Sequence, residues 1–538
     1  MRRNFQFLIF NLKFFAIVII LALASFLRLF RIEDYMTFLG DEGRDVLKVY
    51  EILHGHLTLL GPTSSVGGFF LGPIYYYFMA PFLWLFNYNP VGPAVMVALF
   101  GIVTVFLIYK FTNEFFNKNV ALIAALLYSI SPIVVAYSRS SWNPNPLPFF
   151  SLLTLFLIYK GEVKSKIIYL FAAGILFGIA MQLHYLAIFL GVVILSYILF
   201  VNLINSKNKI SNSLTKIFKE YFYILFGFLI GWSPFLAFEV RHGFLDFKNI
   251  FNFVFHSGGT GASLNFFQTI YDVFFRFFAR LVFAFPPPEQ FYKYPKVAIE
   301  FWTLAVLLVA VSAFLLLFLR LYKSYKDKSD DFKKYLLLFI WAFLGIVLFG
   351  FYKKAIYEYY FAFMFPVPFI LVGNLIERIY AFKNNILPKL FALALLIVIF
   401  VINIQGVPFR YEPNRQLNQA KTIADFVMVK TDAKPFNFAL VSGGNSDHAY
   451  RYFFTIWKHP PVAIEDAAHD PMRKTVTDQL LVVCESPLPC EPLGNSLWEI
   501  AGFGRADIAG HWKVSVVEVY KLVHYKEKNG TATISKAK

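Results

Sequence analysis

The run Ile299-Glu-Phe-Trp-Thr-Leu-Ala-Val-Leu-Leu-Val-Ala-Val-Ser-Ala-Phe-Leu-Leu-Leu-Phe-Leu-Arg320 is followed at once by Leu321-Tyr-Lys-Ser-Tyr-Lys-Asp-Lys-Ser-Asp-Asp-Phe-Lys-Lys334. The first stretch is long enough to cross the hydrocarbon layer of a membrane, which takes about 20 apolar residues. The second stretch is rich in lysine, as the cytoplasmic loops of membrane proteins are. This alternation decides the fold, because it predicts a transmembrane helix that ends in a cytoplasmic loop.

The same alternation recurs along the whole chain and predicts an all-α polytopic membrane domain. Two other apolar segments, 73–86 and 266–285, are predicted to lie flat or re-enter, because a crossing by either would move basic loops to the outside. Asp272, Arg276 and Arg280 also make the second segment a poor span and a good interfacial helix. Eleven spans are predicted, near 8–28, 91–111, 120–138, 148–160, 167–183, 184–203, 221–238, 299–320, 335–352, 357–376 and 388–405.

With eleven spans, every strongly basic loop falls on the same side as the N-terminus. The positive-inside rule makes that side cytoplasmic. The protein is therefore expected to be a multi-pass protein of the plasma (inner) membrane with its C-terminal segment outside. The basic loops are 110–119, 160–166, 204–220, 320–334 and 377–389.

The composition supports this class and excludes others. The 538 residues are 58% hydrophobic and 15% charged, with a mean hydropathy of +0.58, and a soluble globule cannot bury so much apolar surface. The net charge of +17 lies in short loops between apolar runs, and the chain carries no nucleic-acid-binding module. The lipid bilayer is therefore the expected partner, and nucleic acid is not.

Two domains are expected. Residues 1–405 form the transmembrane domain, with a first outer loop at 29–90 and a later outer loop at 239–298. Residues 406–538 form a small extracytoplasmic α/β domain. Cys484 and Cys490 lie in it, and a disulfide and two unpaired core thiols are equally compatible with the sequence. Its expected elements are helices near 416–429 and 447–457 and strands near 438–441, 462–464, 480–483 and 514–519.

The first outer loop opens with an acidic motif, Gly40-Asp41-Glu42-Gly43-Arg44-Asp45, before an expected helix from Glu42 to Leu53. One interpretation is a helix cap, in which Asp41 accepts backbone N–H groups and the neighbouring acids favour the positive end of the helix. The other is catalytic, with Asp41 or Glu42 acting as a general base that faces a membrane-embedded substrate. The residues alone leave both open.

Polar and cationic residues gather at the predicted outer ends of the spans. Cations at helix ends on one face could clamp a lipid phosphate, although unconnected contacts with anionic headgroups explain them equally well. The candidates for binding the donor phosphate or the substrate are Arg139, Asn143, His184, Tyr185, Arg241, His242, Lys353, Lys354 and Tyr359.

An ordered set of motifs resembles the C-type (GT-C) polytopic glycosyltransferases, and within them the branch of protein O-mannosyltransferases and the lipid A aminoarabinose transferase. The resemblance covers about residues 1–405, and Asn143 stands where the branch often has an aspartate. The motifs are Asp41-Glu42 after one span, Gly72-Pro73-Ile74-Tyr75-Tyr76, Tyr109-Lys110-Phe111 with Phe115-Phe116, and Ser131-Pro132 with Tyr137-Ser138-Arg139.

The resemblance implies an inverting transfer of a sugar from a polyprenyl-phosphate carrier to a protein, lipid or glycan acceptor on the outer face, with Asp41 as the functional acid. It also implies no catalytic metal, although a divalent ion is not excluded. A phosphate is already a good leaving group, so one base and several cations suffice, unlike in glycoside hydrolysis. The alternatives are a flippase or transporter of lipid-linked sugars, and a non-catalytic scaffold.

Overall fold

The computed structural model describes residues 2–64, 68–204, 210–255, 265–382, 385–485 and 490–526. The chain divides into two compact units. Unit 1 comprises Met1–Met36 and Ile52–Pro413, and unit 2 comprises Thr37–Glu51 and Asn414–Lys538. The sequence predicts a single boundary near residue 405. In the structure, the segment that carries the acidic motif packs instead with the C-terminal part of the chain.

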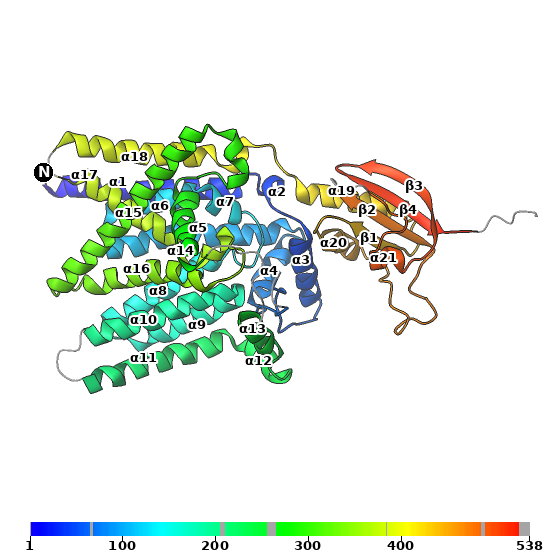
Figure 1. Ribbon diagram of the computed structural model, residues 1–538, viewed down its shortest axis with the longest axis horizontal. Helices are drawn as coiled ribbons and strands as arrows, with labels where there is room; N and C mark the ends of the chain where they lie inside the picture. The colour runs from blue at the N-terminus through cyan, green and yellow to red at the C-terminus, as the bar shows by residue number, and fades with distance from the viewer. Residues whose placement is uncertain are drawn as a thin grey trace, which may run out of the picture. The chain divides into compact units, whose positions relative to one another are not determined.

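Unit 1 is a bundle of helices (Figure 1). Its described elements are α1 (Arg2–Leu29), α2 (Ile32–Tyr35), α4 (Ile74–Leu85), α5 (Val91–Phe115), α6 (Lys118–Ile130), α7 (Pro132–Tyr137), α8 (Leu147–Lys164), α9 (Ile167–Leu183), η1 (Tyr185–Ala187), α10 (Ile188–Ile204), α11 (Ile210–Gly231), α12 (Ser233–Arg241), α13 (Leu245–Phe255), α14 (Phe266–Val282), η2 (Pro288–Lys293), α15 (Lys296–Lys326), α16 (Phe332–Val347), η3 (Leu348–Phe351), η4 (Glu358–Met364), α17 (Pro366–Tyr380), α18 (Ile386–Gln405) and η5 (Pro408–Arg410).

Several of these helices are suited to cross a membrane. Among the described residues, five are long and apolar enough, and the number rises to seven if each of two bent helix pairs forms one span. The bent pairs are α11 with α12 and η4 with α17, which turn by 71° and 67°. Shorter apolar helices occur at Phe14–Leu29, Ile74–Leu85, Lys118–Ile130 and Ile167–Leu183. The membrane character is thus clear, and the number of eleven spans stays a prediction.

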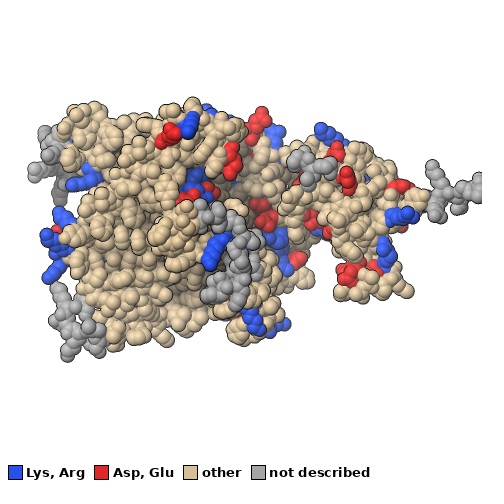
Figure 2. Space-filling view, in the orientation of Figure 1, with Lys and Arg blue, Asp and Glu red and all other residues tan. Residues whose placement is uncertain are grey.

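The two segments predicted not to cross are both helical. The helix α4 has 12 residues and α14 has 17, but α9, which is predicted to cross, also has 17, so the assignment of the two segments stays a prediction. Figure 2 shows a mostly uncharged surface over unit 1, with a group of Lys and Arg side chains at the left end of the bundle. This grouping agrees with the clustering of lysine in the loops of the sequence.

Glycines bring α9 and α11 into backbone contact. A Cβ atom at Gly174 would lie 2.2 Å from the carbonyl oxygen of Ile224, and one at Gly178 would lie 2.6 Å from that of Phe228. On the facing helix, Gly231 approaches the carbonyl oxygen of Ile175 in the same way. Small residues four positions apart allow such close packing between membrane helices. The contact fixes the end of α9, where two of the predicted site residues follow.

Unit 2 contains a four-stranded sheet with the strand order β1-β2-β4-β3. The first two strands are parallel and the other pairs antiparallel, and the core of the unit includes Leu480, Val482 and Leu522. The elements are α3 (Gly40–Leu53), α19 (Gln416–Lys430), β1 (Asn437–Val441), α20 (His448–Ile456), β2 (Gln479–Glu485), α21 (Trp498–Ala501), β3 (Ala506–Val514) and β4 (Val517–His524).

Most elements expected from the sequence in this unit are present. Two expectations are wrong. Residues 462–464 form no strand, although the N–H of Val462 donates to the carbonyl of Phe436. Residues 514–519 are not one strand, because Ser515 has a φ of 54° and turns the chain between β3 and β4. Of the two interpretations of the cysteines, the structure has the disulfide, between Cys484 and Cys490.

Candidate functional site

The acidic motif begins α3, as the sequence predicts. The Asp41 side chain is 59% exposed, and its Oδ1 accepts a hydrogen bond from Nη1 of Arg44 at 3.0 Å. The start of the helix is held by other groups, because Oε2 of Glu42 accepts the N–H of Leu39 at 3.0 Å and Asn445 accepts the N–H of Gly40. The cap interpretation of the motif therefore fits Glu42, whereas Asp41 is turned toward solvent.

Glu42 has an unusual environment. Glu42 is only 6% exposed to solvent. Burial raises the pKa of Glu42 to about 7, and the charges of Asp45 and Asp41 add to this, while the N–H groups of Leu39 and of Glu42 itself oppose it. Asp45 is also buried and is paired with Arg44 at 2.8 Å. The motif thus combines an accessible carboxylate with a buried carboxyl group that titrates near neutral pH.

Residues of α20 and of the loop before it surround this motif within unit 2. Oγ of Ser446 lies 2.7 Å from Nδ1 of His448, and burial lowers the pKa of that histidine. The charges of Asp41 and Arg44 also act on His448. These residues were not among the candidates predicted from the sequence, although a polar loop between a strand and a helix is a common place for functional groups.

In unit 1, three loops bring four of the predicted residues together. The amide of Asn143 donates to the carbonyl of Leu183 at 2.7 Å, at the end of α9. His184 follows and stacks on Tyr185, with ring centroids 4.7 Å apart. The ring of Tyr359 lies 5.7 Å from that of His184 and 4.4 Å from that of Trp142.

This aromatic cluster is polar but uncharged. Nδ1 of His184 accepts the N–H of Leu186 at 3.2 Å, so it carries no proton and the imidazole is neutral in this arrangement. The hydroxyls of Tyr185 and Tyr352 lie 2.7 Å apart. Asn143 and His184 are buried, so the partly exposed Tyr185 and Tyr359 are the members that can offer ring faces and hydrogen bonds to a substrate, and the cluster offers no positive charge.

Arg139 lies apart from this cluster. It is 1% exposed, and its guanidinium donates to the carbonyls of Leu27 at 2.8 Å, Phe30 at 2.8 Å and Arg31 at 3.0 Å. A cation is favourable at the C-terminal end of a helix, and α1 ends here. These contacts hold Arg139 at the end of α1 and occupy both of its terminal nitrogens, and its part in donor binding stays a prediction.

The other predicted cations occupy two different places. Arg241 and His242 end α12, where His242 stacks on Phe238 with ring centroids 4.1 Å apart. Lys353 and Lys354 lie in the loop between η3 and η4. Arg241, His242 and Lys353 are exposed. Their part in donor binding stays a prediction.

Two arginines of α14, which in the sequence indicate only an interfacial helix, meet at one carboxylate. Oε1 of Glu358 lies 3.2 Å from Nε of Arg280 and 3.7 Å from Nη1 of Arg276. Arg276 also donates to the carbonyl of Ile356 at 2.9 Å and pairs with Asp272 at 3.0 Å. Their spacing on α14 was visible in the sequence, but their acidic partner lies 78 residues away from Arg280.

Arg280 also lines a groove of about 960 Å³ in unit 1. Arg410 contributes a second cation, and most of the wall is apolar, from residues of α7, α15 and α18. Phe301 and Val398 in this wall are 72% and 51% exposed, as side chains that face lipid are. A largely apolar groove with cations in its wall has the chemistry to hold a lipid phosphate.

Solved structures share this fold. ArnT from Cupriavidus metallidurans, bound to undecaprenyl phosphate, matches 94% of this chain and 97% of its own at 13% identity, with a TM-score of 0.62. The chain resembles the C-type glycosyltransferases in fold. A second structure with this C-type fold is the oligosaccharyltransferase AglB from Archaeoglobus fulgidus, in complex with an inhibitory peptide and a dolichol-phosphate. It matches 87% of this chain and 69% of its own at 15% identity, with a TM-score of 0.50.

Sequence comparisons give the same resemblance to the C-type glycosyltransferases. Residues 71–237 match the family of dolichyl-phosphate-mannose-protein mannosyltransferases. Two Bacillus subtilis (strain 168) proteins, both named provisionally as mannosyltransferases, match shorter segments. YycA is 26% identical over 164 residues, or 30% of this chain and 23% of YycA. YkcB is 37% identical over 82 residues, or 15% of this chain and 12% of YkcB.

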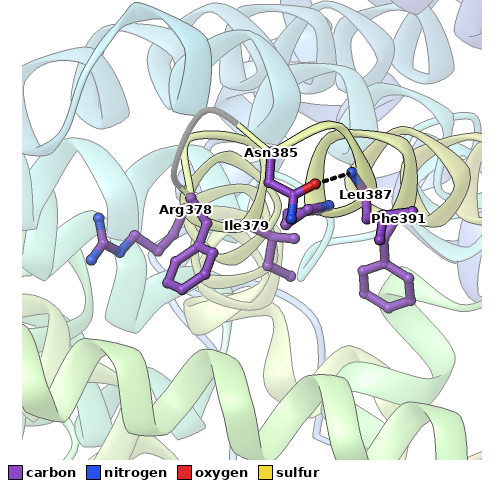
Figure 3. A pocket seen from close by; sticks show the side chains of 7 residues that line it. Arg378, Ile379, Asn385, Leu387 and Phe391 are labelled. Carbon is purple, nitrogen blue, oxygen red and sulfur yellow. Dashed lines mark hydrogen bonds between the residues drawn. The ribbon is translucent and has the colours of Figure 1, made fainter.

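Two further features of the chain concern metal binding and a second pocket. Within the described ranges, no group of three or more His, Cys, Asp or Glu side chains is placed to hold a metal ion. A pocket of about 590 Å³ lies between Arg378 of α17 and Phe391 of α18, where Oδ1 of Asn385 accepts the N–H of Leu387 (Figure 3). Its wall is almost wholly apolar and its loop is one of the predicted cytoplasmic loops, so we do not assign it to the transfer.

Proposed function

We propose that this protein is an inverting glycosyltransferase that moves a sugar from a polyprenyl-phosphate carrier to an acceptor hydroxyl on the outer face of the membrane. The observation that carries the proposal is the pair at the start of α3, where the exposed Asp41 stands beside Glu42, a buried carboxyl with a pKa of about 7. A carboxylate that a substrate can reach, in a chain with the C-type fold, suits general base catalysis.

In this reaction the acceptor hydroxyl oxygen forms a bond to the anomeric carbon of the sugar. The bond from that carbon to the phosphate oxygen breaks, and its electron pair leaves with the phosphate of the carrier. The hydroxyl proton goes to the carboxylate of Asp41, which Arg44 orients at 3.0 Å. Glu42 holds the start of the helix through Leu39 and, with its pKa near 7, can share the proton.

The leaving phosphate gains charge as the bond breaks, and cations must offset that charge. Arg280 is the candidate best supported by contacts, because it combines a place in the wall of the apolar groove with a neighbouring second arginine, Arg276. Glu358 occupies both arginines in the free protein. An incoming phosphate would take its place. The apolar part of the groove would hold the isoprenoid chain.

Four residues of the aromatic cluster complete the proposal. Tyr185 and Tyr359 offer ring faces and hydroxyl groups, which suit the apolar and polar surfaces of a sugar, and the buried Asn143 and His184 support them. Arg241, His242, Lys353 and Lys354 remain candidates for contact with the donor. If arginines neutralise the negative charge that develops on the departing phosphate, the reaction needs no metal ion.

The test compares Asp41→Asn with Asp34→Asn in cells. Asp34 is a matched control, because its carboxylate also pairs with an arginine three residues away, Arg31, at 2.7 Å. Lipid-linked sugars and surface glycans are measured by mass spectrometry. We expect cells that carry Asp41→Asn to accumulate one lipid-linked sugar, and we expect transfer to fall about 100-fold, the scale of a lost general base.

Normal transfer in the Asp41→Asn variant at a normal membrane level would contradict the catalytic role. A flippase or a scaffold would also lose nothing in this variant, so the same result would return those alternatives.

A further inference from the structure

The acidic motif is anchored on the C-terminal part of the chain. Residues 37–51 form one compact unit with residues 414–538. The N–H of Phe38 donates to Oε1 of Gln416 at 3.1 Å, and the ring of Phe38 lies 6.4 Å from that of Tyr452 and 5.9 Å from that of Phe453. The segment before the carboxylates is thus held by groups about 400 residues later in the chain.

Both glycines of the motif are required by this contact. A Cβ atom at Gly40 would lie 2.1 Å from Oγ of Ser446, and one at Gly43 would lie 2.3 Å from the backbone nitrogen of Ala449. Any side chain at Gly43 would collide with backbone, which cannot move aside as a side chain can. The two glycines flank Asp41 and Glu42, so the carboxylates sit on a backbone-to-backbone contact.

Asn445 joins the two segments by hydrogen bonds. Its Oδ1 accepts the N–H of Gly40 at 2.9 Å and that of Ser446 at 3.0 Å. Its Nδ2 donates to both oxygens of Glu485, at 3.0 and 3.1 Å. Glu485 ends β2 and also accepts the hydroxyl of Tyr450 at 3.0 Å. The amide of Asn445 is therefore fully oriented by a carboxylate of the sheet.

We propose that Asn445 is a positioning residue for the catalytic carboxylates, and that the C-terminal domain sets their place through the hydrogen-bonded chain Glu485–Asn445–Gly40. This inference rests on the proposed function, because it assumes that Asp41 and Glu42 act in transfer. The N–H of Gly40 is one of the first of α3, and its acceptor decides where the helix begins. Misplacement of a catalytic group by about 1 Å can cost about 100-fold in rate.

Charged groups face this site from both sides. Asp41, Arg44 and Asp45 lie with Glu42 on α3, and His448 at the start of α20 interacts with Asp41 and Arg44. Asp447 and Arg451 also act on His448, and Glu485 accepts hydrogen bonds from the amide of Asn445.

The change Asn445→Ala alters none of these formal charges, but it removes the amide donors of Glu485. Glu485→Gln keeps an acceptor for Asn445 without the charge, so a shift in the pH profile that Asn445→Ala shows and Glu485→Gln does not show reports a change in the geometry around Glu42.

The experiment uses the full-length protein in membrane vesicles. The donor is the lipid-linked sugar that accumulates in cells lacking the protein, extracted and added back at varied concentration and pH. The variants are Asn445→Ala, Asn445→Asp, Glu485→Gln, and Asn445→Asp combined with Glu485→Gln. Asn445→Asp alone sets two carboxylates against each other, whereas the double change reverses donor and acceptor and restores the bond.

Asn495→Ala is the matched control. This asparagine lies in the same domain and its Oδ1 also accepts a backbone N–H at a helix start, that of Leu497 at 3.1 Å. It lies outside the contacts with residues 37–51 described above. Both Asn445→Ala and Asn495→Ala therefore lose one hydrogen bond at the start of a helix, and only Asn445→Ala loses the contact with residues 37–51.

We expect Asn445→Ala and Asn445→Asp to lower kcat about 10-fold or more, to leave KM for the donor near its original value, and to move the pH profile. The double change should recover most of kcat, and Asn495→Ala should match the original protein. An unchanged kcat in Asn445→Ala would overturn the inference, and so would a double change that folds without recovery. If Asp41→Asn also leaves transfer unchanged, the proposed function itself has failed.

Discussion

Replacing Glu42 by glutamine should change how the stability of the protein depends on pH. The carboxyl is 6% exposed, and burial raises its pKa from 4.5 to about 7. Below pH 4.5 the group is protonated in both the folded and the unfolded state, so it has no effect on the pH dependence. Between pH 4.5 and 7 the unfolded state loses the proton and the folded state keeps it. The folded state then binds more protons, so stability falls as the pH rises.

The size of the effect follows from the shift. A difference of about 2.5 pH units corresponds to about 3 kcal/mol, since one unit is 1.36 kcal/mol. The whole cost is present above pH 7. Glutamine cannot ionise, so it does not carry this cost. The free energy of unfolding of Glu42→Gln, relative to that of the original protein, should therefore be about 3 kcal/mol higher at pH 8 than at pH 4.5. For a unit of this size, that corresponds to roughly 10 °C in Tm.

The assay is thermal unfolding of the purified full-length protein in detergent at pH 5 and pH 8. Glu51→Gln is the matched control, because Glu51 lies on the same helix with a side chain that is 51% exposed and pairs with Lys48 at 2.8 Å. We expect its Tm difference from the original protein to be equal at both pH values. An equal difference at both pH values for Glu42→Gln would refute the argument that burial raises the pKa of this carboxyl.

Other variants test the phosphate site and the packing. Arg280→Gln should raise KM for the lipid-linked donor about 30-fold, because a charge-assisted hydrogen bond contributes about 2 kcal/mol; an unchanged KM would remove Arg280 from the site. Glu358→Gln keeps an acceptor for Arg280 but removes the competing charge, so KM for the donor should fall about fivefold; a higher KM would show that Glu358 supports the site instead. Gly178→Ala places a methyl group 2.6 Å from a backbone oxygen and should cost about 2 kcal/mol in thermal unfolding, more than Gly191→Ala, whose nearest neighbour is the ring of Phe177. Cys484→Ser opens a disulfide between residues six apart and should destabilise unit 2 by about 2 kcal/mol, which limited proteolysis of that unit would detect.

The sequence by itself determined the class of the protein and most of its elements. Apolar runs and lysine-rich loops are set by the cost of burying charge in lipid, and this cost acts locally on every segment. The helix that follows Asp41-Glu42 and the alternation of helices and strands after residue 414 were visible for the same reason, because periodicity is a local property. The strand expected at 462–464 failed because three apolar residues do not determine a pairing partner.

Tertiary structure alone decided which residues meet. The sequence placed Arg139 among the candidate phosphate-binding cations, but in the structure both of its terminal nitrogens donate to carbonyls at the end of α1 and just after it. Arg280 and Glu358 are joined across 78 residues, and Gly40 and Asn445 across 405. Local sequence patterns predict neither pairing, because each depends on how distant segments pack. The pKa of Glu42 belongs to the same group, since desolvation is a property of the folded surroundings and not of the residue.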